Sequence, residues 1–167
     1  MKFYENLSES MKNLSERGAF LTVTNADGTT NTMTISWGYI GFSWERPMFI
    51  TMIRPQRFTS EVIQNADSFT ISIPFSDEMK KALMICGSKS GRDTNKLEAA
   101  SIEYVSAKSV TGSVVAECDM YYECKISYCD SLNMEKLNED IFAKYYKGDS
   151  HDFFFGEIVD VYGKDKA

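Results

Sequence analysis

Alternating apolar and polar residues along this chain predict a protein built mainly from β-strands. The segment Phe69-Thr70-Ile71-Ser72-Ile73 alternates strictly and ends at Pro74, as a half-buried strand does. An Asp27-Gly28 turn, which suits a hairpin, follows another apolar run. Applied to the whole chain, this pattern predicts strands at 19–24, 31–40, 46–59, 69–74, 102–107, 113–117, 120–128 and 152–162.

Helical spacing of apolar residues predicts short helices between these strands. The first covers 3–15 and ends at Gly18. A second covers 59–66 with Thr59 or Ser60 as N-cap, and a third covers 77–85 with Ser76 as N-cap. Residues 95–100 are also expected to be helical, whereas 132–146 reads equally well as a helix or as a partly ordered excursion.

The organisation predicted from this pattern is a single domain over 1–167. A chain of 167 residues buries roughly 70% of its unfolded surface, which is enough for one sizeable core. No repeated strand–helix–strand unit occurs, and the strands follow one another at regular spacing. We therefore expect an antiparallel β-barrel with short helices, closed because closure buries one face of each strand and removes sheet edges.

Charge narrows the choice of partners. The net charge of -6 disfavours nucleic acid or an anionic membrane as the main partner, because both require a basic surface. The N-terminal residues 1–18 are polar and no apolar run approaches the length of a membrane span, so we expect a cytoplasmic protein. Cationic side chains nevertheless gather in two short segments, 54–57 and 89–96, so an anionic ligand is still compatible with the sequence.

Known cofactor and catalytic motifs are not found. The chain has no Gly-x-Gly-x-x-Gly dinucleotide motif and no Walker loop. No metal-ligand cluster or catalytic triad is visible, and the cysteines at 86, 118, 124 and 129 lack Cys-x-x-Cys pairing. We expect reduced, partly buried thiols, with a disulfide or redox role as the less favoured alternative.

The most informative stretch has two parts, 31–40 and 46–59, which read as two strands joined by a turn that contains Pro47. Small hydroxyl and amide side chains occupy the first part, where they could face a flat polar ligand. The second part ends in Arg54, Arg57 and Thr59, and guanidinium groups bind phosphate in a bidentate way. The start of the helix near Thr59 could add backbone N–H groups. The alternative is that both arginines are solvated charges at a strand end.

These motifs resemble the flavin reductase-like, or flavoredoxin-like, family over roughly 17–162. The resemblance rests on 31–37 with 54–59, on Ser90-Gly91-Arg92-Asp93 with Lys96, and on His151 followed by Phe155-Gly156-Glu157. It implies a split β-barrel, antiparallel and Greek-key-like, that binds FMN without a covalent bond near the interface of a homodimer.

The family likeness also assigns site residues. His151 is expected to contact flavin or nicotinamide and is the candidate catalytic residue, although it need not act as an acid or base. The alternative for His151 is an exposed loop histidine. The expected cofactor-binding residues are Asn31, Thr32, Met33, Thr34, Ile35, Ser36, Trp37, Arg54, Arg57, Phe58, Thr59, Cys86, Gly87, Ser88, Lys89, Ser90, Gly91, Lys96 and Phe155.

The function implied is that of a flavoprotein passing electrons from NAD(P)H or a protein donor through FMN to an unknown acceptor. Hydride transfer to a flavin needs positioned rings and no protein nucleophile, which agrees with the lack of a triad. Two alternatives stay open: an FMN electron-transfer module without nicotinamide activity, and a split-barrel binding protein for another ligand such as haem.

Overall fold

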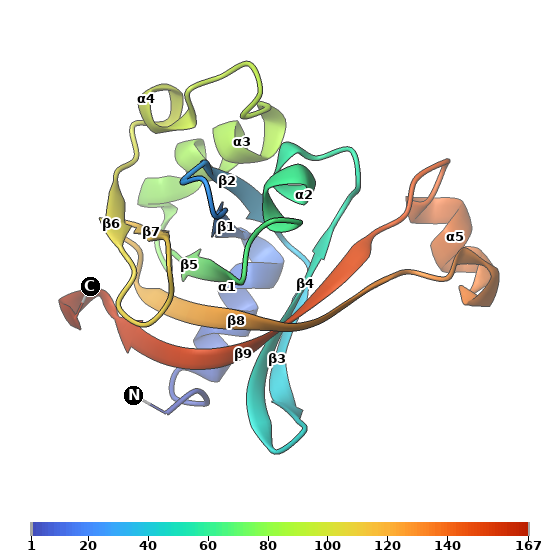
Figure 1. The fold of residues 1–167 in the computed structure, drawn as a ribbon, viewed down its shortest axis with the longest axis horizontal. Helices are drawn as coiled ribbons and strands as arrows, with labels where there is room; N and C mark the ends of the chain where they lie inside the picture. The colour runs from blue at the N-terminus through green and yellow to red at the C-terminus, as the bar shows by residue number, and fades with distance from the viewer. Residues whose placement is uncertain (1, 167) are drawn as a thin grey trace.

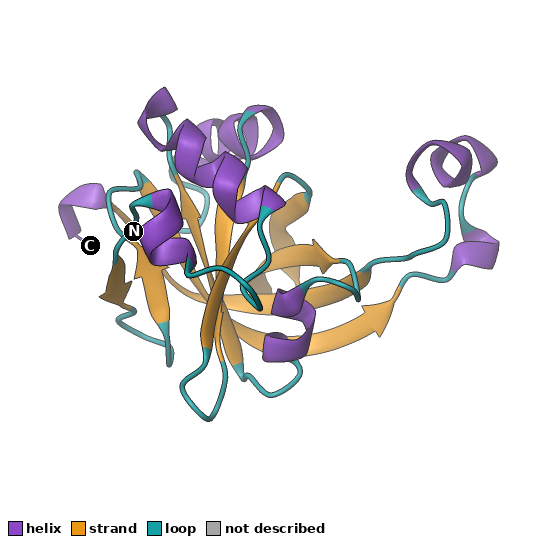
Figure 2. Cartoon of the chain, turned by 90° about the horizontal axis from the view of Figure 1, so that it is seen from above, coloured by secondary structure: helices purple, strands orange, loops and turns teal. Residues whose placement is uncertain are grey.

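The computed structural model describes residues 2–166 and contains an antiparallel sheet of seven strands with short helices packed around it (Figures 1 and 2). The strands are β1 (Ala19–Thr24), β2 (Thr30–Ile35), β3 (Gly38–Ser43), β4 (Arg46–Ile53), β5 (Ser68–Ile73), β6 (Tyr104–Ser106), β7 (Ser113–Val115), β8 (Met120–Ser131) and β9 (Asp152–Gly163). The α-helices are α1 (Leu7–Glu16), α2 (Phe58–Ile63), α3 (Lys80–Ser88), α4 (Lys96–Ala100) and α5 (Glu139–Tyr145). The 3-10 helices are η1 (Asp77–Met79), η2 (Met134–Lys136) and η3 (Lys164–Lys166).

The sheet is open between two strands that follow each other in sequence. Its strand order is β2-β1-β5-β8-β9-β4-β3, and every neighbouring pair is antiparallel. Within residues 2–166 no ladder joins β2 to β3, so the closed barrel expected from the strand pattern is wrong in this detail. The mainly-β antiparallel class with short helices is confirmed.

The opening arises at Ser36 and Trp37, where the chain leaves one ladder and enters another. Pairing of β2 with β1 ends at Ile35, and pairing of β3 with β4 begins at Gly38. The single strand expected over 31–40 is therefore two strands. Ser36 and Trp37 belong to neither ladder, and this two-residue step at the sheet edge forms one wall of the site described below.

The turn between β3 and β4 differs from expectation as well. It is formed by Trp44 and Glu45, both with positive φ (53° and 59°), and not by Pro47. Positive φ at both central residues suits a tight hairpin because it matches the twist of the strands. Pro47 lies inside β4, where only β3 is paired, so its missing N–H interrupts no ladder with β9.

Apolar side chains pack into two clusters, one on each face of β1, β5 and β8. Leu21, Ile71 and Tyr122 belong to the cluster inside the barrel. Phe20 and Tyr121 face the other way, into a cluster covered by α3, α4 and the two-stranded sheet of β6 and β7. These central strands are buried on both faces, so the strict alternation of β5 did not mark a half-buried strand: all six of its residues are buried. The hydroxyls of Thr70 and Ser72 on its second face are hydrogen-bonded to the backbone of Ser113 and Val115 in β7.

The four expected helices are present in the expected order, with shifted boundaries. Helix α1 starts at Leu7, and Gly18 terminates it with φ +93°, a conformation that other residues adopt at a cost. Ser76 caps η1 as expected. The N-cap of α2 is Arg57, not Thr59 or Ser60. Cys86, Gly87 and Ser88 were expected in a loop, but they form the last turn of α3.

Strands β8 and β9 form a long ribbon that carries residues 132–150, here called the arm. The arm contains η2 and α5, so the ambiguous segment 132–146 is partly helical. In both views α5 sits at the end of this ribbon, apart from the helices α1–α4 (Figures 1 and 2). Ile141 and Phe142 on α5 are exposed.

Two further properties of the described residues bear on the expectations. All four cysteines are free thiols, with Cys129 exposed and the other three buried. Over residues 2–166 no helix combines the length and the apolar character that crossing a bilayer requires.

Candidate functional site

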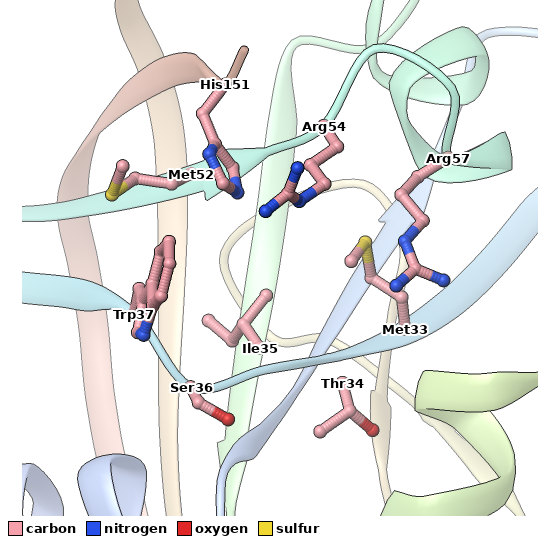
Figure 3. Close-up of a pocket in the computed structure, with 9 residues that line it drawn as sticks. All are labelled: Met33, Thr34, Ile35, Ser36, Trp37, Met52, Arg54, Arg57 and His151. Carbon is pink, nitrogen blue, oxygen red and sulfur yellow. The ribbon is translucent and has the colours of Figure 1, made fainter. Parts of the chain in front are cut away.

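Two adjoining cavities lie at the opening of the sheet and share Met33 and Arg57 in their walls. The first, here called the edge cavity, has a volume of about 320 Å³. Its walls are Met33, Thr34, Ile35, Ser36, Trp37, Met52, Arg54, Arg57 and His151 (Figure 3). The second, here called the loop cavity, has a volume of about 340 Å³. Its walls are Asn31, Met33, Gln56, Arg57, Phe58, Thr59, Cys86, Ser88, Lys89, Ser90, Gly91, Arg92 and Lys96.

The edge cavity is built where β2, β4 and the start of β9 meet. The step at Ser36 and Trp37 forms one side, Met52 and Arg54 at the end of β4 form another, and His151 closes the top (Figure 3). Because β2 has no strand partner on this side, backbone polar groups near its end are available to a ligand, whereas the carbonyl of Thr32 already accepts from Lys96. A flat polar molecule could therefore meet aromatic, thioether and backbone groups together.

His151 is buried, which excludes the reading of it as an exposed loop residue. It is 6% exposed, its Nδ1 lies 3.0 Å from the hydroxyl of Tyr146, and its ring lies 5.3 Å from that of Trp37. Burial lowers the pKa of His151 to about 4, and the positive charge of Arg54 acts in the same direction. The imidazole is therefore uncharged at neutral pH.

Arg54 lines the edge cavity, but its charge is already paired with the arm. One NH group donates to the carboxylate of Asp149 and another donates to the carbonyl of Tyr145 at 3.2 Å. Gln56 donates to the other oxygen of Asp149. These hydrogen bonds lower the pKa of Asp149, so the carboxylate stays ionised beside the guanidinium. Arg54 thus ties the arm to β4.

Arg57 and Lys96 supply positive charge to the loop cavity. Arg57 donates to the carbonyl of Gly87 at 3.1 Å. Lys96 is only 7% exposed, and its ammonium group donates to the carbonyls of Thr32 (2.7 Å) and Cys86 (3.2 Å). Burial lowers the pKa of Lys96 and raises that of Cys86, so the neighbouring thiol stays protonated. Both cations bond to neutral carbonyls, and no carboxylate within residues 2–166 pairs with either one.

The floor of the loop cavity depends on a close backbone approach. Asn31 donates to the Thr59 hydroxyl at 2.7 Å, which joins β2 to α2. A Cβ atom at Gly91 would overlap the side-chain oxygen of Asn31 and lie 2.9 Å from Phe58. Only glycine fits there without displacing its neighbours, so the loop after α3 is held against this pair.

Most residues expected from the sequence line one of the cavities, but three do not. Thr32 is fully buried, with its hydroxyl 2.8 Å from those of Thr22 and Tyr104. Gly87 packs against Thr34 and lines a separate cavity, although its carbonyl accepts from Arg57. Phe155 packs against Trp44 and Tyr128 near the β3–β4 turn.

Met52, Gln56 and Arg92 line the cavities although they were not among the expected site residues. Arg92 had been noted in the Ser90-Gly91-Arg92-Asp93 motif, and it pairs with Glu61 and lies over the Phe58 ring at 5.5 Å. In β4, Met52 alternates with the buried residues Thr51 and Ile53, so its side chain lies on the opposite face of the strand. This alternation could have identified Met52 from the sequence. Nothing in the sequence marks Gln56.

Comparison with known proteins identifies the family. The model of the "Flavin reductase like domain" matches residues 11–167. An uncharacterized protein of Archaeoglobus fulgidus is 26% identical over 131 residues, which cover 78% of this chain and 64% of that protein. This chain thus spans less than two thirds of that relative.

Solved structures show the same fold at low sequence identity. A flavoredoxin of Desulfovibrio vulgaris (Miyazaki F) has a TM-score of 0.69 at 22% identity, covering 89% of this chain and 70% of its own. An FMN-binding protein from Thermus thermophilus gives the same values. An NADH:FAD oxidoreductase of Streptomyces globisporus has a TM-score of 0.65 at 15% identity, covering 88% and 75%. The split-barrel expectation is confirmed by these neighbours.

Proposed function

Because the chain belongs to the flavin reductase-like domain family, we propose that it is an FMN-binding oxidoreductase that passes electrons from NAD(P)H to an acceptor. The observation that carries this proposal is the pair of cavities joined at Met33 and Arg57. One has the aromatic and edge-strand character that suits a three-ring head, and the other has the cations and hydroxyls that suit a phosphate. FMN combines both groups in one molecule.

The residues of each cavity have distinct tasks in this proposal. Arg57 and Lys96 hold the phosphate through charge-assisted hydrogen bonds, with the hydroxyls of Ser88 and Ser90 beside them. Trp37, Met52 and His151 surround the ring, and the unpaired edge of β2 offers it backbone groups. Bound flavin supplies the hydride-accepting and electron-passing chemistry, while the chain orients the ring and shields part of it from water.

Flavin titration tests this proposal directly. We expect FMN added to the purified chain to lose fluorescence and to bind more tightly than riboflavin, because only FMN carries the phosphate. Tighter binding of FAD than of FMN would show that the cofactor is FAD, and the proposed oxidoreductase function would stay the same. A chain that binds none of the three flavins would contradict the proposal.

Reduction by NADH or NADPH distinguishes the proposed enzyme from an electron-transfer module without nicotinamide activity. Anaerobic addition of NADH or NADPH to the flavin-loaded chain should bleach the flavin absorbance within seconds to minutes. A flavin that only dithionite or a reduced protein donor bleaches would instead identify an electron-transfer module without nicotinamide activity.

We also propose that two copies associate through exposed aromatic side chains of the β3–β4 hairpin. Tyr39, Phe42 and Trp44 on the β3–β4 hairpin are 57%, 64% and 59% exposed, with Tyr128 nearby. Large aromatic side chains that are exposed together on one hairpin are typical of a protein–protein interface. Light scattering should give twice the monomer mass, and Phe42→Glu should reduce it to one copy. Met84→Glu, at a 65% exposed position on α3, is the matched control.

A further inference from the structure

Beyond the cavity walls, the structure contains a buried hydrogen-bonded pair that no expectation from the sequence included. Tyr146, the residue after α5, is 3% exposed, and its hydroxyl lies 3.0 Å from Nδ1 of His151. The two rings are nearly perpendicular, with centroids 5.5 Å apart. Within residues 2–166 no protein group is hydrogen-bonded to the opposite nitrogen, Nε2. Figure 3 shows the imidazole directed into the edge cavity between Trp37 and Arg54.

We propose that Tyr146 is a positioning residue that donates its hydroxyl hydrogen to Nδ1 of His151 and thereby fixes the proton of the imidazole on Nε2, which faces the edge cavity. His151 then presents a hydrogen-bond donor to the ligand in that cavity. The identity of the ligand atom rests on the proposed function: with FMN bound, the acceptor is a ring nitrogen or carbonyl oxygen of the flavin.

The direction of this hydrogen bond follows from the chemistry of the two groups. A neutral imidazole has one N–H and one bare nitrogen, and the bond made by one nitrogen decides which carries the hydrogen. Burial raises the pKa of Tyr146, so the hydroxyl keeps its hydrogen at neutral pH. A phenol is a good donor and an imidazole nitrogen a good acceptor, so Tyr146 donates to Nδ1.

The charged groups around the pair favour the same arrangement. The guanidinium of Arg54 lies 5.8 Å from the centre of the Tyr146 ring, and its charge polarises the hydroxyl toward donation. Arg54 also disfavours a second proton on His151. Asp149 and Asp152 act in the opposite direction, but Asp149 is bonded to Arg54 and Gln56, and Asp152 accepts from Ser131. The neutral imidazole therefore persists at neutral pH.

The test uses the fact that the chain contains a single histidine. In an untagged chain labelled with ¹⁵N-histidine, two-bond ¹H–¹⁵N spectra at pH 7 report directly which ring nitrogen is protonated. We expect the Nε2–H form in the ligand-free protein. Tyr146→Phe should lower the ratio of Nε2–H to Nδ1–H about fivefold, the size expected for loss of one hydrogen bond. Tyr145→Phe removes a hydroxyl one residue away and should leave the ratio unchanged.

Each outcome bears on a defined part of the proposal. An Nδ1–H form in the wild-type protein would overturn it without any variant, so the test survives if Tyr146→Phe does not fold. A ratio that is equal in wild type and Tyr146→Phe would also overturn it. Addition of FMN should move the Nε2 signal of the wild-type protein. If FMN fails to bind, the proposed function is wrong, whereas the tautomer of the ligand-free protein still decides the role of Tyr146.

Discussion

The edge cavity and the loop cavity share Met33 and Arg57, and each contains one arginine that a carboxylate already pairs, but they differ in their remaining titratable groups. Around the edge cavity, Arg54 is paired with the carboxylate of Asp149, and His151 is kept neutral by burial. Around the loop cavity, Arg57 and Lys96 donate only to neutral carbonyls, so their charges are not cancelled. Electrostatic attraction for a ligand is therefore concentrated in the loop cavity, although the chain carries a net charge of -6.

This difference suggests a division of labour within the proposed flavin site. The loop cavity supplies affinity through its cations, and the edge cavity supplies orientation through neutral and apolar groups. Because the groups around the edge cavity are neutral or already paired, a ring system that fills the cavity removes few unpaired charges from water, and the desolvation cost is small. Four changes test this division, in order of decreasing expected effect.

The largest effect should come from pH acting on His151. The unfolded chain binds a proton at this residue near pH 6.5, whereas the folded chain does so only near pH 4. Between these values the unfolded state binds more protons, so the free energy of unfolding falls as pH falls, by up to about 3 kcal/mol. Urea unfolding from pH 7 to 4.5 measures this loss.

His151→Gln is the control for that measurement because glutamine does not titrate. Carboxylates distant from His151 contribute equally to both proteins, so the difference between the two profiles reports on His151 and its coupling to Asp149 and Asp152. Parallel profiles would mean that the edge cavity does not hold the imidazole neutral.

Arg57→Ala should have the next largest effect, on cofactor affinity. Loss of a charge-assisted hydrogen bond to phosphate costs about 2 kcal/mol, which weakens FMN binding roughly 30-fold. Riboflavin, which lacks the phosphate, should lose much less. Arg46→Ala removes a guanidinium that pairs with Glu157 outside both cavities and should leave FMN affinity unchanged. Unchanged FMN affinity in Arg57→Ala would show that the anion has been placed wrongly.

Gly91→Ala should have a moderate effect on the loop cavity. The new methyl group displaces Asn31, and loss of the Asn31–Thr59 hydrogen bond costs about 1 kcal/mol. We expect a roughly fivefold loss of FMN affinity by fluorescence titration. Gly41→Ala is the matched control, because a Cβ there meets no atom within 4 Å. Equal affinities in the two variants would show that this close packing has no influence on binding.

Arg54→Ala should have the smallest effect on FMN affinity, less than about threefold, because its charge is already satisfied by Asp149. Its effect should appear elsewhere, as faster amide hydrogen exchange in residues 139–150, which lose their contact with β4. A loss of affinity as large as that of Arg57→Ala would remove the contrast between the cavities.

The sequence predicted most of the strands and the two segments that form the cavities. Local alternation determines β5, and the small polar residues at 31, 32, 34 and 36 lie within six positions of one another, so both are visible without the fold. The family resemblance connected these segments with the loop after α3 and with His151. Spacing alone does not connect them, because they are distant in sequence.

The features that were missed depend on contacts across the chain. Arg54 meets Asp149, 95 residues away, and that pairing ties it to the arm while it lines the edge cavity. Phe155 was expected at the cofactor, but β9 pairs it with Ile50 and Tyr128, which directs its ring to the β3–β4 hairpin. Ladder irregularities in β8, such as the shift between Ile126 and Tyr128, set this register and leave no local signal.

The attachment of the arm has a consequence for how this scaffold can diversify. No residue of the arm, 132–150, belongs to the apolar cluster inside the barrel, and Arg54, Gln56 and His151 hold the arm from the barrel side. Insertions or replacements in such an excursion cost the folded sheet little. Changes in the arm can therefore alter which molecules reach the opening of the sheet while the barrel stays the same. Foreign segments can be inserted in place of the arm, between the end of β8 and the start of β9.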